Sequence, residues 1–149
     1  MLIRMLPDQI AKWWIIEGEH GIKQMVEAAL PPIAGDGDDR MNSILAMLLA
    51  GAMDCWAIMN EDQVIRGMLT TTFTFDSCTN TKNLLLYTLY TVEETGPEDW
   101  KEGFDRISKW AAGHDCQNVV CYTQNEAIVN NALAVGGQIW SYIAFPLST

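Results

Sequence analysis

The sequence is poor in basic side chains. It has nine Lys and Arg residues against nineteen Asp and Glu residues, which gives a formal net charge of -10. A chain of this charge repels nucleic-acid phosphates and anionic lipid surfaces, so we expect neither nucleic acid nor a membrane as a partner. A protein partner with a basic surface fits this charge better. The plainer explanation is that the acidity only keeps the chain in solution.

Cysteine and histidine are also scarce, and long apolar runs are missing. The longest apolar run, Ile44–Met53, has ten residues, whereas a membrane helix needs about 20. The N-terminus lacks the apolar stretch and cleavage site of a signal peptide, so we expect a cytoplasmic protein. Because CxxC pairs and zinc-ligand spacing are absent, we predict buried, reduced thiols and no metal site. The residues in question are Cys55, Cys78, Cys116, Cys121, His20 and His114.

Apolar residues make up 49% of the 149 residues and include six Trp and eight Met, which is enough to fill a core. We therefore predict a single domain over residues 1–149, with a helical N-terminal part over 1–52 and a mixed-sheet core over 53–149. Pro7 and Asp8 can open a first helix, and Gly21–Leu30 forms a second. Asn42 or Ser43 can cap a third helix that Gly51 ends.

The remaining two thirds indicate strands alternating with helices. Two strands in an antiparallel hairpin are followed by the order strand, helix, strand, helix, strand, which predicts an α/β (α+β) fold with a mixed sheet. Asn125 is placed to cap the last helix. The predicted strands and helices are Cys55–Asn60, Val64–Phe75, Leu84–Val92, Pro97–Ala112, Asn118–Tyr122, Glu126–Val135 and Ile139–Phe145.

This order, together with the stretch NEAIVNNALAVGG, resembles the GCN5-related N-acetyltransferase superfamily over about residues 40–147. Asn125, Ile128 and Gly136 match the Asn, the small or apolar residue and the Gly of that family's pattern in the last helix. The resemblance implies an acetyltransferase-like mixed sheet and acetyl-CoA as the cofactor of an active member. Ala132 stands where the family often has a Tyr general acid, and a methyl group cannot protonate a thiolate.

A larger departure lies in the stretch EETGPEDW, between a predicted strand and the helix that Pro97 opens. The family carries Gln or Arg and then two small residues here, which cradle the cofactor's pyrophosphate. In this sequence Thr95 takes the first of those positions, Glu98 the second and Trp100 the third. Glycine lets backbone N–H groups approach a phosphate closely, whereas a carboxylate and an indole add negative charge and bulk.

Two interpretations follow. The preferred one is a catalytically degenerate acetyltransferase-fold protein that binds no cofactor and acts through protein contact. In this respect it is similar to small acetyltransferase-like proteins of tailed phages, which implies a basic or virion-associated partner and a place in the host cytoplasm or the virion. The sequence leaves open whether the chain forms homo-oligomers. Six tryptophans can fill the core, or Trp13, Trp14, Trp100 and Trp140 can in part mark an interface.

The alternative is an active acetyl-CoA-dependent N-acyltransferase with a modified loop. The resemblance then implies that the acyl acceptor lies between the strands Leu84–Val92 and Asn118–Tyr122. A base would come from Glu93 or Glu94, and Tyr122, Tyr87 or Tyr90 would replace the missing acid. Apart from this alternative, Cys121 is a candidate nucleophile if His114 comes near it, although a buried thiol is the simpler prediction. The cofactor would contact Tyr90, Thr91, Val92, Thr95, Gly96 and Asn125.

Overall fold

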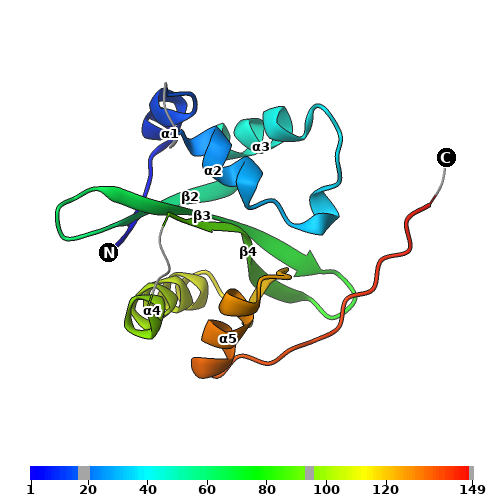
Figure 1. Cartoon of the computed structure of the whole chain (residues 1–149). Helices are drawn as coiled ribbons and strands as arrows, with labels where there is room; N and C mark the ends of the chain where they lie inside the picture. Colours follow the sequence, from blue (N-terminus) through cyan, green and yellow to red (C-terminus); the bar gives the residue numbers. More distant parts are fainter. Residues whose placement is uncertain (17–20, 93–95, 148–149) are drawn as a thin grey trace.

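The computed structural model describes residues 1–16, 21–92 and 96–147 and is built on one five-stranded sheet (Figure 1). The strand order is β1-β2-β3-β4-β5. The first four strands pair antiparallel, and β5 pairs parallel to β4. The predicted hairpin and mixed sheet are therefore confirmed. The strands are β1 (Leu2–Arg4), β2 (Met53–Met59), β3 (Ile65–Asp76), β4 (Thr81–Thr91) and β5 (Asn118–Cys121).

Helices cover both faces of this sheet (Figure 1). The N-terminal helices α1, α2 and α3 lie on one face, and α4 and α5 lie on the other. The predicted helices are all present with small shifts at their ends. The helices are α1 (Pro7–Trp13), α2 (Ile22–Ala28), the short 3-10 helix η1 (Pro32–Ala34), α3 (Arg40–Leu49), α4 (Pro97–Gly113) and α5 (Glu126–Ala134).

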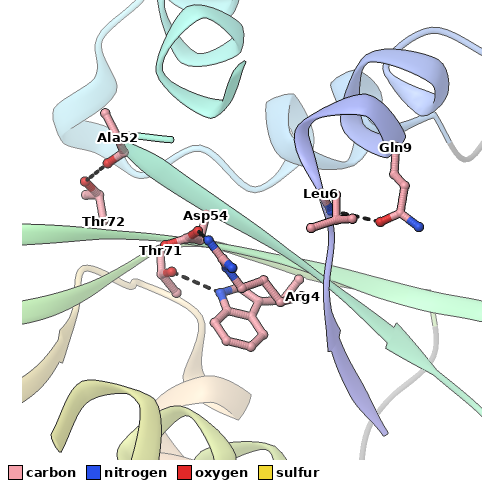
Figure 2. A network of polar contacts seen from close by, with 8 residues as sticks. Arg4, Leu6, Gln9, Ala52, Asp54, Thr71 and Thr72 are labelled. Carbon is pink, nitrogen blue, oxygen red and sulfur yellow. Dashed lines mark hydrogen bonds and ion pairs between the residues drawn. The ribbon is translucent and has the colours of Figure 1, made fainter. Parts of the chain in front are cut away.

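Two apolar layers result from the alternation of side chains along the central strands. On β2, Cys55 and Ala57 face the N-terminal helices, whereas Trp56 between them faces α4. The indole N–H of Trp56 donates to Thr71 Oγ1 at 3.0 Å, so this buried polar group is satisfied (Figure 2). This hydrogen bond lets the large side chain of Trp56 fill the apolar layer under α4.

The N-terminal part contains a strand that the sequence pattern did not indicate. Leu2–Arg4 pairs with Trp56–Ile58 of β2 and forms one edge of the sheet. At this edge Arg4 forms an ion pair with Asp54 at 2.9 Å (Figure 2). The guanidinium carbon of Arg4 lies 4.8 Å from the centre of the Trp110 ring. Three residues are too few to show the alternation of apolar and polar side chains that marks a strand in a sequence. The strand forms because β2 offers it a partner.

Three predictions about local structure were wrong. Residues 139–145 form no strand, because nothing within the described residues pairs with them. Helix α3 begins after Asp39 and not at Asn42 or Ser43, since Arg40 donates to the carbonyl oxygen of Gly35 and ties the loop to the first turn. Among the thiols only Cys55 is buried, whereas Cys78 and Cys121 are exposed and Cys116 is half-buried.

Candidate functional site

The pairing of β4 with β5 ends half-way along β4, where β5 itself ends. Their parallel pairing runs from Asn83 with Asn118 to Leu86 with Cys121 and stops there. At the same point β4 has a bulge against β3, since Thr71 pairs with Leu86 and Thr70 with Thr88, which leaves Tyr87 as the extra residue. A bulge bends its strand. The bulge therefore bends β4 just beyond its last residue paired with β5, at the place where the sequence analysis put the acyl acceptor.

Three tyrosines lie in or next to the two strands near the end of this pairing. Tyr87 and Tyr90 are half-buried and pack against the layer of the N-terminal helices. Burial raises the pKa of Tyr87, while the nearby charge of Arg40 acts in the opposite direction. Tyr122 follows the end of β5 and is exposed, with its ring centre 5.4 Å from that of Tyr142. Tyr87 stays protonated at neutral pH, as a proton donor must.

The junction of β4 and α4 holds most of the predicted cofactor contacts. Tyr90 and Thr91 end β4, and the N–H of Val92 donates to the carbonyl oxygen of Arg66 at 2.8 Å. Gly96 is the N-cap of α4. Glu93, Glu94 and Thr95 lie outside the described residues, so the predicted bases and the predicted Gln/Arg position have no described geometry.

The first turn of α4 carries negative charge and little donor capacity. Pro97 at the first helical position has no N–H, and the N–H of Trp100 donates to the carbonyl oxygen of Gly96 at 3.2 Å. The other two amides of this turn belong to Glu98 and Asp99, whose side chains are exposed. Those carboxylates suit the positive end of the helix dipole and repel another anion there.

Asn125 lies at the start of α5, as predicted, and its side chain acts as the helix cap. Its Oδ1 accepts hydrogen bonds from the N–H groups of Ala127 at 2.9 Å and Ile128 at 3.4 Å. At the other end Gly136 has φ +94°, and the N–H groups of Gly136 and Gly137 donate to Leu133 and Ala132. This is a Schellman motif. A Cβ at Gly137 would come within 2.8 Å of the Ala132 carbonyl oxygen, which explains the absence of a side chain there.

Sequence reasoning missed a cavity of about 400 Å³ between α4 and the sheet. It reaches the β4–α4 junction at Thr91 and Asp99. No local pattern marks it, because its walls come from four strands and a helix far apart in the sequence. Its lining includes the apolar residues Leu69, Leu86, Leu89, Trp100, Phe104 and Ile107 and the charged residues Glu61, Arg66 and Glu102.

The geometry gives little support to a cysteine nucleophile or to a metal site. Burial raises the pKa of the Cys121 thiol even though the residue as a whole is exposed, so the thiolate that a nucleophile needs is disfavoured. His114 Nδ1 lies 2.7 Å from the carbonyl oxygen of Trp110, within the end of α4. Over the described ranges, no three His, Cys, Asp or Glu side chains group as metal ligands, and no helix is long and apolar enough to cross a membrane.

Comparison with known proteins places the fold. No family model matches the chain, and no curated protein matches it in sequence. Among solved structures, it is similar to the aminoglycoside N-acetyltransferase AAC(6')-Iy in complex with a bisubstrate analogue, with 14% identity, a TM-score of 0.69, and coverage of 100% of this chain and 97% of the other.

Two further acetyltransferases show the same likeness. The ribosomal-protein-alanine N-acetyltransferase from Brucella melitensis biovar Abortus 2308 has 9% identity and a TM-score of 0.64, with 99% of each chain covered. The aminoglycoside 6'-N-acetyltransferase AAC(6')-Ih from Acinetobacter baumannii has 11% identity and a TM-score of 0.63, with coverage of 100% of this chain and 97% of that one. The chain has the fold of the GCN5-related N-acetyltransferases.

Proposed function

We propose that this chain uses the acetyltransferase fold as a scaffold for contact with another protein and binds acetyl-CoA weakly or not at all. The observation that carries the proposal is the first turn of α4. A pyrophosphate at a helix N-terminus needs several N–H donors and close backbone approach. Here Pro97 removes one donor, and the amides of Glu98 and Asp99 stand beside their own carboxylates.

Charge indicates the kind of partner. The net charge of -10 includes exposed carboxylates on the first two turns of α4, those of Glu98, Asp99 and Glu102. A protein with a basic surface would be attracted to this region, and the attraction would weaken as salt screens it. Co-purification from the native source at low and high salt identifies that partner, and binding that is insensitive to salt contradicts an electrostatic contact.

Thermal unfolding with acetyl-CoA tests the proposal. A ligand that binds the folded state stabilises it by about 2.7 kcal/mol at 100 times its dissociation constant. We expect the unfolding temperature to stay unchanged in millimolar acetyl-CoA. A dose-dependent rise, absent with free adenine nucleotide at the same concentration, would contradict the proposal and favour an enzyme.

An active N-acyltransferase is the second candidate, and the bulge of β4 beyond its last pair with β5 favours it. The aminoglycoside enzyme named above was solved with CoA. In this chain a base would take the proton of an acceptor amine as the amine attacks the thioester carbonyl, and Tyr87 or Tyr122 would protonate the departing thiolate. Glu93 and Glu94 are the proposed bases. Under this candidate Glu93→Gln with Glu94→Gln abolishes acyl transfer, and full activity of that variant excludes them.

A further inference from the structure

The cavity under α4 is a space apart from the region expected to transfer an acyl group. Its lining comes from the first four strands, the turn after β2 and α4, and among the described residues none of β5 or α5 contributes to it. Of the residues expected to contact acetyl-CoA, only Thr91 lines it. Its volume of about 400 Å³ lies within the range of small-molecule sites in proteins, which is roughly 300–1,000 Å³.

Gly103 leaves room for this cavity on α4. Trp100, Gly103, Phe104 and Ile107 are three or four residues apart, so they share one face of the helix, and all of them line the cavity. A Cβ atom at Gly103 would meet nothing within 4 Å. A larger side chain at this position would therefore project into the cavity, and the glycine keeps it open although glycine is a poor helix former.

The buried part of the lining is apolar. Leu2, Leu69 and Ile107 are buried, and Leu86 and Leu89 between them on the sheet side are half-buried. Walls of this kind offer water few hydrogen bonds, whereas a hydrocarbon chain gains by leaving water for them. The interior therefore suits the aliphatic part of a ligand.

Carboxylates predominate among the charged side chains of the lining. Glu61 comes from the turn after β2, Asp99 and Glu102 come from α4, and all three residues are exposed. Within the described lining they stand against one guanidinium, that of the half-buried Arg66. Because exposed residues contribute to the lining, the cavity meets solvent beside them. A cation is favoured there by the carboxylates and by the two aromatic rings of α4.

We propose that the cavity under α4 binds a small amphiphilic cation, whose hydrocarbon chain lies against the buried leucines and whose ammonium head lies beside Glu61, Asp99 and Glu102. A quaternary ammonium head fits best, because carboxylates and aromatic faces both attract it. Such a head has no N–H to acylate, so the ligand is distinct from an acyl acceptor. The site goes beyond the proposed protein contact and does not depend on it.

Calorimetry with octyltrimethylammonium, below its micelle concentration, tests the proposal. We expect saturable binding of one molecule per chain. The hexyl analogue should bind roughly 15-fold more weakly, since each buried methylene accounts for about a fourfold change in affinity. Octanoate has a chain of similar length and an anionic head that would pair with Arg66 instead. If the octyl cation does not bind saturably, or if octanoate binds as tightly, the proposal is overturned.

A substitution that fills the cavity locates the binding. Gly103→Leu should abolish the binding of octyltrimethylammonium, because the new side chain takes the place of the hydrocarbon chain. Gly113→Leu makes the same change at the end of α4, outside the lining and with open space around its Cβ, and should leave the affinity unchanged. Equal affinities in a folded Gly103→Leu variant and the parent place the ligand elsewhere and overturn the proposal.

A pair of exposed carboxylates tests the ammonium head without touching the core. Glu61→Gln with Glu102→Gln should weaken the binding of octyltrimethylammonium by about 5-fold. The control, Asp105→Asn with Glu126→Gln, removes the same charge at exposed residues outside the lining and should bind like the parent. An equal loss in both double variants would mean that only net charge attracts the cation, which overturns the proposed site. Circular dichroism verifies that each variant folds.

Discussion

Asn125 shows how a residue matched to a family pattern can be explained by local physics. Its side chain accepts from two amides at the start of α5 and so satisfies donors that the helix cannot. We expect Asn125→Ala to lower the free energy of unfolding by about 1 kcal/mol and to speed hydrogen exchange at Ala127 and Ile128. Asn125→Asp keeps an acceptor and should behave like the parent. If hydrogen exchange at Ala127 and Ile128 were equally fast in the two variants, the cap would not be the role of Asn125.

Cys55 makes the stability of the fold depend on alkaline pH. Burial, and to a smaller extent the charge of Asp54, raise the pKa of its thiol from the ordinary 9.0 to about 12. The unfolded chain therefore loses this proton first, so stability is full below pH 9 and falls by about 1.4 kcal/mol per pH unit as the pH rises from there toward 12. Urea unfolding from pH 8 to 10.5 should show a shallower decline in Cys55→Ala. Identical slopes would contradict this.

Gly67 of β3 lies where the neighbouring strands leave no room for a Cβ atom. A Cβ here would collide with the carbonyl oxygen of Tyr90 on β4 and with the side chain of Ile58 on β2. Since a backbone oxygen cannot move aside, we expect Gly67→Ala to cost about 1–3 kcal/mol. Gly103→Ala is the matched control, because its Cβ meets nothing within 4 Å in α4, and a helical Ala gains about 1 kcal/mol over Gly. Denaturant unfolding measures both values.

At the junction of β4 and α4, two substitutions are predicted to strengthen the binding of acetyl-CoA. If Glu98 and Trp100 exclude the cofactor, then Glu98→Gly with Trp100→Ala restores small residues where phosphate needs backbone contact. We expect calorimetry to detect acetyl-CoA binding at least 10-fold tighter than in the parent, despite a helix-propensity cost of about 1 kcal/mol for the new Gly. Glu102→Gly, one turn later in α4, is the control. Equal affinities in all three proteins would mean that other residues close the site.

How far the sequence predicts the fold depends on how local each signal is. The hairpin of β2 and β3, the cap at Asn125 and the helix opened by Pro97 are encoded in neighbouring residues, and all three are confirmed. In contrast, β1 and the cavity under α4 depend on contacts between distant segments. The strand predicted at 139–145 has the right composition, but composition cannot supply the edge that pairs with it.

At the scale of the whole molecule, the excess of acidic side chains opposes compaction. A formal charge of -10 at pH 7 means that like charges repel within the folded chain, and salt screens this repulsion. We expect the unfolding temperature to rise between 20 and 300 mM NaCl, by about 2–4 °C for each kcal/mol gained. Potassium chloride should give the same rise, because screening depends on ionic strength.

The same salt should act in the opposite direction on a basic partner. Screening removes the attraction between the exposed carboxylates of this chain and a positive surface, so partner binding should weaken while the chain itself becomes more stable. Measuring both quantities in one salt series separates an electrostatic contact from loss of the fold. If stability and partner binding rose together, apolar surface would have to dominate the contact, and the acidity would serve solubility alone.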